Sequence, residues 1–209
     1  MVKDTETFRS LYPFTDHWLH IDGVRMHYVD EGPDSSADGA EKPVVVMVHG
    51  NPTWSFYFRR LIVAAAKEYR VIVPDHIGCG LSDKPQEYTY TLARHTDNLE
   101  RLLEHLGVKR ILMVMHDWGG AIGMGYALRH PEKMVGFMPC NTAVFYPPKL
   151  PLSIRMCRIP FWGAGVVRGL NGFLETALIF GTSQRKRFTA DVRAGYLAPY
   201  DSWRNRVAI

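Results

Sequence analysis

The sequence predicts an α/β fold: a doubly wound, mostly parallel sheet with an inserted helical cap. Short apolar runs of strand length, such as Val44 to Val48, alternate along the chain with stretches of helix length. A hairpin signal, Asp22-Gly23, precedes this alternation. After Asn141 the alternation stops and a segment rich in Pro and Gly begins. The chain is therefore expected to consist of a sheet followed by a cap.

The elements of the sheet can be assigned in order. Trp18 to Ile21 and Val24 to Val29 alternate apolar and polar residues around Asp22-Gly23, which predicts an antiparallel hairpin. Strands separated by helices then imply right-handed βαβ crossovers. These expected elements are a strand at Val44 to Val48, a helix at Phe56 to Lys67, a strand at Arg70 to Pro74, a helix at Thr91 to Leu106, a strand at Ile111 to Met115, a helix at Gly120 to His130 and a strand at Met134 to Pro139.

The last third of the chain has a different composition. Four prolines precede four glycines, and mixed helical patches continue to Ile209 without another clear buried strand. These residues are Pro147, Pro148, Pro151, Pro160, Gly163, Gly165, Gly169 and Gly172. We therefore expect a core over residues 1–145 and a helical cap over 146–209. The cap contains four aromatic residues, Phe161, Trp162, Phe173 and Phe180. Each by itself is expected to occupy a core position, and the four together indicate an apolar pocket.

Composition excludes several classes of protein. With 46% hydrophobic and 22% charged residues, the 209-residue chain is globular rather than disordered. The net charge is +4, but the Lys and Arg residues are scattered along the sequence. The one basic run, Gln184 to Arg187, is interpreted as a solvated face rather than a nucleic-acid site. Three cysteines, Cys79, Cys140 and Cys157, are too few and irregular for a disulfide framework or a zinc site.

The ends and apolar runs of the chain predict its compartment. The N-terminus is polar where a signal peptide would be basic and apolar, and no run is long enough to span a bilayer. We expect a cytoplasmic protein with no membrane span, and the oligomeric state stays open.

Three loops that follow predicted strands hold the candidate chemistry, because ligands bind outside the carboxyl ends of parallel strands. They are His49-Gly-Asn-Pro-Thr-Trp54, Asp75-His-Ile-Gly-Cys-Gly-Leu-Ser-Asp-Lys-Pro85 and His116-Asp-Trp-Gly-Gly120. The third loop has the pattern of a nucleophile elbow, a sharp strand-to-helix turn that tolerates only small residues just beyond its apex. Its apex is Asp117, so the predicted nucleophile is a carboxylate, which can displace a leaving group from carbon and form an ester.

Together these three motifs resemble the haloalkane dehalogenase group of the α/β-hydrolases, and the resemblance runs from about Tyr12 to the end. It implies that Asp117 is the nucleophile and that the side chains of Asn51 and Trp118 hold the departing halide. It also implies that the backbone N–H groups of Asn51 and Trp118 form an oxyanion hole. No cofactor or metal is implied, and the substrate is expected to be small and apolar.

Two further segments point to a narrower group. Tyr196-Leu-Ala-Pro-Tyr-Asp-Ser-Trp-Arg-Asn-Arg206 and Asn141-Thr-Ala-Val-Phe145 resemble the β-lactone decarboxylases of bacterial olefin biosynthesis, which share the dehalogenase framework. Such an enzyme opens a four-membered lactone and loses carbon dioxide, leaving an alkene. Both interpretations use Asp117 and differ in the leaving group, a halide or the lactone carboxylate.

The catalytic base that the resemblance implies has no counterpart in the sequence. Members of the family carry a histidine beyond the cap and an acid that orients it, whereas the last histidine here is His130. The sequence therefore predicts a chain that is truncated before the last strands of the sheet, in which an alkyl-enzyme ester forms but does not turn over. A nonhydrolytic variant is the other explanation.

Each of these residue types also has a less specific role in proteins. Asp117 at a helix start, Asn51 in a loop and Trp118 in a core all occur without function. For His116 a packing role is favoured over a base, and for Asp75 and His76 a structural loop over a metal pair.

Two alternative functions stay open. An epoxide hydrolase would need cap tyrosines such as Tyr196 and Tyr200 to polarise the epoxide oxygen. The alternative of another class is a non-catalytic protein that binds apolar ligands.

Overall fold

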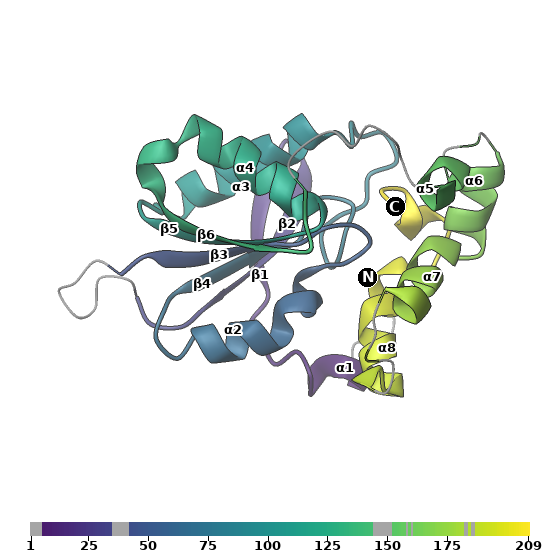
Figure 1. Cartoon of the computed structure of the whole chain (residues 1–209), viewed down its shortest axis with the longest axis horizontal. Helices are drawn as coiled ribbons and strands as arrows, with labels where there is room; N and C mark the ends of the chain where they lie inside the picture. Colours follow the sequence, from purple (N-terminus) through teal and green to yellow (C-terminus); the bar gives the residue numbers. More distant parts are fainter. Residues whose placement is uncertain are drawn as a thin grey trace.

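The computed structural model describes residues 6–34, 42–143, 152–157, 159, 161–181, 184 and 187–209. Within these ranges a six-stranded sheet has the strand order β1-β2-β4-β3-β5-β6 (Figure 1). Its strands are β1 (His17–Ile21), β2 (Val24–Glu31), β3 (Val44–Val48), β4 (Val71–Pro74), β5 (Ile111–His116) and β6 (Met134–Cys140).

The direction of the strands changes twice across the sheet, because β2 alone runs opposite to the other strands. β1 pairs antiparallel with β2, and β2 antiparallel with β4, whereas β4, β3, β5 and β6 run parallel. The predicted hairpin is confirmed: Ile21 pairs with Val24, and both Asp22 (φ 48°) and Gly23 (φ 82°) have the positive φ of a two-residue hairpin turn. The mostly parallel α/β sheet expected from the sequence is therefore present.

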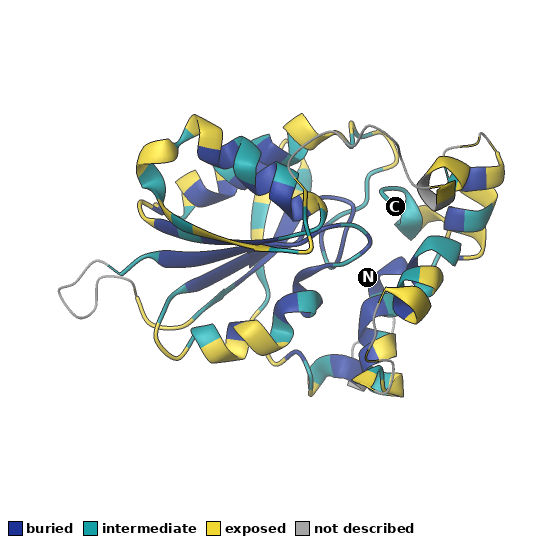
Figure 2. Cartoon of the chain, viewed as in Figure 1, coloured by how far each residue is buried: buried dark blue, intermediate teal, exposed yellow. Residues whose placement is uncertain are grey.

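β3 lies between two parallel neighbours and is buried along its whole length. Its side chains alternate, so Val44, Val46 and Val48 join one hydrophobic cluster while Val45 and Met47 join another on the opposite face. Figure 2 shows the buried strands between more exposed helices. A strand with both faces covered needs an uninterrupted apolar run, which is why this segment was recognisable from the sequence.

Helices cover both faces of the sheet. α3 (Leu92–His105) and α4 (Trp118–Arg129) lie on one face, and α2 (Arg59–Ala65) lies on the other (Figure 1). A 3₁₀ turn, η1 (Ser55–Phe58), leads into α2. Thr91 is the N-cap of α3, with its hydroxyl accepting a hydrogen bond from Arg94 N. α4 begins at Trp118 rather than at the predicted Gly120, because the chain passes from β5 into the helix through the single residue Asp117.

The helices after β6 gather at the end of the sheet where the loops after β3 and β4 lie (Figure 1). These elements are α5 (Leu152–Cys157), α6 (Trp162–Ala164), the π-helical turn η3 (Gly165–Gly169), α7 (Gly172–Phe180), α8 (Ala190–Leu197) and the turns η5 (Ala198–Tyr200) and η6 (Arg204–Arg206). The N-terminal helix α1 (Glu6–Arg9) lies at the same end of the sheet. We call α5 to α8 the cap helices. The predicted boundary between 145 and 146 lies outside the described residues, as do Pro147, Pro148, Pro151 and Pro160.

α8 attaches the cap helices to the core through aromatic side chains. Trp54 is fully buried, and its indole Nε1 donates a hydrogen bond of 3.1 Å to Gly195 O. The ring of Phe56 meets the ring of Tyr196 edge to face, with centroids 5.2 Å apart. The loop after β3 is therefore packed against α8.

Cap aromatics elsewhere do not follow the prediction. Phe161 is 94% exposed and Phe180 72%, Trp162 is exposed as well, and Phe173 is half-buried. The expectation that these four residues fill a core is wrong for Phe161, Trp162 and Phe180, because the turn before α6 and the short helices α6 and α7 leave these side chains on the outside. Among the helices of the described ranges, none has the length and apolarity needed to cross a bilayer.

Candidate active site

Asp117 occupies a strained turn between β5 and α4. Its φ of 53° and ψ of −128° are unusual for a residue other than glycine, and such strain persists only where surrounding contacts enforce it. Asp117 N donates to Asn141 O at 3.3 Å, and Asp117 O accepts from Gly120 N at 3.0 Å. Thr142 Oγ1 also donates to Asp117 O at 2.5 Å. The segment after β6 therefore helps to hold the elbow.

The glycines after Asp117 allow the turn to pack closely. A Cβ on Gly119 would overlap the backbone carbonyl of Val48, and one on Gly120 would overlap the Thr142 side chain. Both glycines are buried in the first turn of α4. The sequence interpretation that these positions require small residues agrees with this geometry.

Asn51 and Asp117 are brought together by the loop after β3. Asn51 N donates to Asp117 Oδ1 at 2.9 Å, across 66 residues of sequence. Gly50 lies so close that a Cβ there would overlap the Asp117 carboxylate. The backbone N–H of Asn51 is thus aimed at the predicted nucleophile, while its side-chain Nδ2 donates to Ala208 O at 3.1 Å and its Oδ1 is buried without a partner among the described residues.

Trp118 is the first residue of α4 and is 57% exposed. Because the first N–H groups of a helix have no intrahelical acceptor, the backbone N–H of Trp118 is a donor without a partner inside α4. The exposure excludes the interpretation of Trp118 as an ordinary core residue.

His116 packs rather than pairing with Asp117. Its ring stacks on Tyr57 with centroids 4.1 Å apart, and no partner of its buried Nδ1 is found in the described part of the chain. Burial lowers the pKa of His116. The neutral, stacked ring agrees with the packing role favoured from the sequence.

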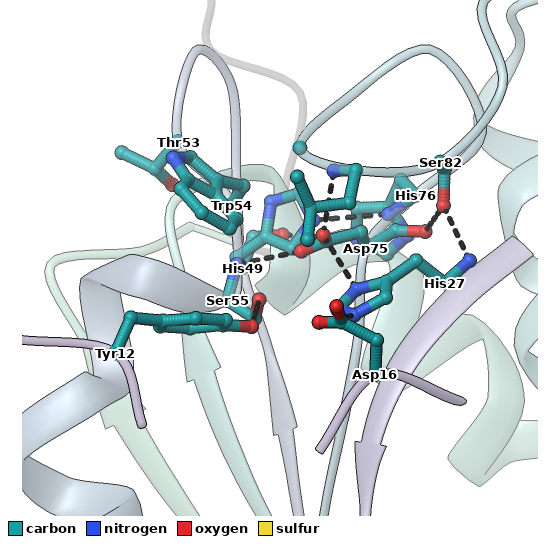
Figure 3. A network of polar contacts seen from close by, with 12 residues as sticks. Tyr12, Asp16, His27, His49, Thr53, Trp54, Ser55, Asp75, His76 and Ser82 are labelled. Carbon is teal, nitrogen blue, oxygen red and sulfur yellow. Dashed lines mark hydrogen bonds and ion pairs between the residues drawn. The ribbon is translucent and has the colours of Figure 1, made fainter. Parts of the chain in front are cut away.

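A buried polar network links the loop after β4 to the loop after β3 (Figure 3). Asp75 is fully buried, with Oδ1 accepting from Ser55 N at 2.7 Å and Oδ2 accepting from Leu81 N at 2.9 Å. His27 Nδ1 lies 2.9 Å from Asp75 Oδ2. Tyr12 joins the network through a 2.5 Å hydrogen bond between its hydroxyl and Ser55 Oγ. Asp75 is thus a structural centre, as the sequence indicated.

His49 and His76 connect the same two loops. His76 N donates to His49 Nε2 and His76 Nε2 donates to His49 O, both at 3.0 Å. Since His49 Nε2 accepts, its Nδ1 carries the proton and donates to Gly50 O at 2.8 Å. Burial lowers the pKa of both rings, so the two histidines are neutral structural groups.

His27 was not singled out by sequence reasoning. It lies between Asp75 and Asp16, with Nε2 at 3.2 Å from Asp16 Oδ1. Burial lowers the pKa of His27, but the hydrogen bonds to Asp16 and Asp75 outweigh burial and raise the pKa to about 9. The signal in the sequence was weak: a histidine in an otherwise ordinary strand, whose acidic partners are 11 and 48 residues away.

The raised pKa of His27 predicts a pH dependence of stability. Folding raises the pKa from 6.5 to about 9, so the protonated ring stabilises the fold fully below pH 6.5 and this contribution is lost as the pH rises through 9. We expect the Tm of the unmutated chain to fall between pH 7 and 10 more steeply than that of His27→Asn. Thermal unfolding followed by circular dichroism checks this, and parallel Tm curves would contradict it.

Among the residues that the structure describes, one group of side chains has the spacing of a metal site. Glu100, Glu104 and His130 place one ligand atom each within 4.8 Å of one another. Glu100 already accepts from His130 Nε2 at 2.5 Å and from Arg129 at 2.6 Å, which describes an ion-pair cluster on α3 and α4. It lies at the opposite end of α4 from Asp117 and takes no part in the candidate site.

The fold and the elbow define the class of protein. Residues 43–177 match the protein family described as alpha/beta hydrolase fold. The chain belongs to the α/β-hydrolase fold family.

Within that family the chain is similar to named enzymes. The cis-3-alkyl-4-alkyloxetan-2-one decarboxylase of Shewanella oneidensis is 45% identical over 205 residues, which cover 95% of this chain and 62% of that protein. Haloalkane dehalogenase 2 of Mycobacterium tuberculosis is 34% identical over 178 residues, 84% of this chain and 59% of that protein. The solved haloalkane dehalogenase of Bradyrhizobium elkani superposes with a TM-score of 0.81 at 27% identity, over 93% of this chain and 67% of that one. The chain spans about three-fifths of the length of these curated relatives.

Proposed function

We propose that this chain carries the nucleophile of an α/β-hydrolase that attacks alkyl carbon through Asp117. The observation that carries the proposal is the strained backbone of Asp117, held in the elbow with its carboxylate against Asn51 N. Asn51 and Trp118 are proposed to hold the departing anion and, through their backbone N–H groups, the oxyanion. Residues 1–145 form the core and 146–209 the cap in this proposal.

The proposed substrate is a small apolar β-lactone with two alkyl groups, since the decarboxylase of Shewanella oneidensis is 45% identical to this chain and the dehalogenase of Mycobacterium tuberculosis 34%. An Asp117 oxygen bonds to the alkyl-substituted ring carbon that carries the ring oxygen, not to the carbonyl carbon. That carbon–oxygen bond breaks, and its electron pair leaves on the new carboxylate. Loss of carbon dioxide then forms the double bond and expels Asp117 as a free carboxylate. Atoms and charges balance without water.

Carbon–halogen cleavage is the second candidate, supported by the dehalogenase relatives. The same oxygen bonds to carbon while the halide leaves with the bonding pair, and the resulting ester needs water for its cleavage.

The geometry favours both of these reactions over epoxide opening. Tyr200 is fully buried and its hydroxyl donates to Thr53 O at 3.3 Å, while Tyr196 is buried beside Phe56. The hydroxyl of Tyr200 is thus engaged with Thr53 and that of Tyr196 with Arg59, rather than with Asp117.

The test is covalent trapping on the unmutated chain. After incubation with a 1-bromoalkane and an acid quench, we expect a mass gain of one alkyl group, mapped by peptide fragmentation to Asp117. Asp117→Ala is expected to show none. A dialkyl β-lactone is expected to yield the alkene and carbon dioxide with the unmutated chain only. If the folded chain forms neither the adduct nor the alkene, the proposal fails. That result would favour the alternative of a non-catalytic protein that binds apolar ligands.

A further inference from the structure

The loop that brings Asn51 N to Asp117 is fastened at both of its ends to the loop after β4. At its start, His49 accepts from His76 N and its carbonyl accepts from His76 Nε2. At its end, Ser55 N donates to Asp75 Oδ1 at 2.7 Å. The position of Asn51 N therefore depends on where Asp75 and His76 stand.

The Asp75 carboxylate is an unusual support because it is charged and fully buried. Burial opposes ionisation, but the hydrogen bond and the positive charge of His27 hold the pKa of Asp75 below its usual range. A buried carboxylate without such compensation would be strongly unfavourable. The fixed position of Asp75 thus depends on His27.

The geometry of His27 identifies it as a cation. Its Nδ1 faces Asp75 Oδ2 at 2.9 Å and its Nε2 faces Asp16 Oδ1 at 3.2 Å. Ionised carboxylates only accept hydrogen bonds, so both ring nitrogens donate and the imidazole is protonated. Arg9 pairs with Asp16 at 2.7 Å, which completes an alternating row of charges (Figure 3 shows its inner part).

We propose that protonated His27 and Asp75 are positioning residues for the chemistry at Asp117. His27 fixes the Asp75 carboxylate, Asp75 fixes Ser55 N, and the loop so held keeps Asn51 N on Asp117 Oδ1. Neither residue touches the substrate or the reacting atoms. The inference rests on the proposed function, in which Asp117 is the nucleophile.

The first expected consequence is a split between rate and binding. A displacement of the loop moves Asn51 N and so changes the orientation of the Asp117 carboxylate. A shift of about 1 Å in a reacting group can lower a rate about 100-fold. For His27→Asn we expect a smaller displacement and a maximal alkylation rate about 10-fold lower. The bromoalkane concentration at half-maximal rate is expected to stay unchanged, because His27 does not touch the substrate.

The second consequence is a pH profile. As the pH rises through the pKa of His27, the ring loses its charge and one donor, so alkylation by the unmutated chain is expected to fall. We call this fall in the alkylation rate at high pH the upper limb of the profile. His27→Asn, which has no ionisable group at this position, is expected to lack it. The titratable and charged groups around the ring that shape the limb are Asp16, Asp75, Arg9, Tyr12 and His49.

The matched control is Asp30→Asn. Asp30 lies three positions further along β2 and pairs with Arg70 at 2.6 Å, a partly buried ion pair without contact to the loop. We expect it to keep both the alkylation rate and the upper limb, whereas a merely structural role for His27 would make the two variants alike once stability is matched.

The experiment is a time course of intact mass at several 1-bromohexane concentrations and at pH values from 6 to 10, with folding followed by circular dichroism. A slower maximal rate and a lost upper limb in His27→Asn alone support the inference. If the unmutated chain alkylates Asp117 at one rate across this range, or the variant matches it, the inference is overturned while the proposed function stands. Should His27→Asn not fold, the profile of the unmutated chain decides. If the unmutated chain forms no Asp117 adduct, alkene release from a dialkyl β-lactone is followed over the same pH range with both variants, and only the absence of both products rejects the proposed function.

Discussion

Gly50→Ala is expected to lower the rate of alkylation at Asp117 about 100-fold without unfolding the chain. Gly50 lies against the Asp117 carboxylate, and an added Cβ would overlap both Oδ1 and Cγ. Either the carboxylate turns away from Asn51 N or the loop after β3 moves outward. Both displace the attacking oxygen by about 1 Å, enough for an effect of this size in an aligned displacement. The measurement is the initial rate of alkyl adduct formation by intact mass.

The control for Gly50→Ala is Gly165→Ala. Gly165 lies in the cap, where an added Cβ meets nothing within 4 Å. This variant is expected to alkylate like the unmutated chain. Equal rates for both variants would mean that the carboxylate does not depend on the close approach of Gly50.

Trp54→Ala is expected to destabilise the chain by about 3–5 kcal/mol. Trp54 is fully buried between Phe8, Tyr12 and Phe56, and its indole supplies the hydrogen bond to Gly195 O. Its removal leaves a cavity and an unpaired carbonyl where α8 meets the core. Since a domain is stable by only about 5–15 kcal/mol, this is a large fraction of the total. Urea unfolding measured by tryptophan fluorescence and circular dichroism gives the value.

Trp162→Ala is the matched control, because Trp162 is 58% exposed on the cap. An exposed substitution of this kind is expected to change the free energy of unfolding by about 0.5 kcal/mol or less. A similar loss in both variants would show that packing at Trp54 is not what joins α8 to the core.

The elements of the sheet could be predicted from sequence because their signals are local. β3 was located residue for residue, since a strand covered on both faces must be apolar throughout. The hairpin at Asp22-Gly23 followed from turn chemistry. Ends of helices were less accurate: α4 starts two residues earlier than predicted, because the elbow needs a single connecting residue.

The candidate site was predictable where its residues are sequential. The elbow around Asp117 and the loop with Asn51 carry recognisable spacing, and the structure brings them within 2.9 Å. The exposure of Phe161 and Phe180 could not be predicted, because the composition of a short helix or turn does not determine which side meets the core.

The sequence by itself determined the family, the succession of strands and helices along the chain, and the candidate nucleophile. Each of these depends on residues that are close in sequence. Only the tertiary structure revealed that Thr142 holds the elbow and that His27, Asp16 and Asp75 form one buried row of charges. These contacts join residues up to 48 positions apart, and whether a buried charge is stable depends on partners that only folding brings together.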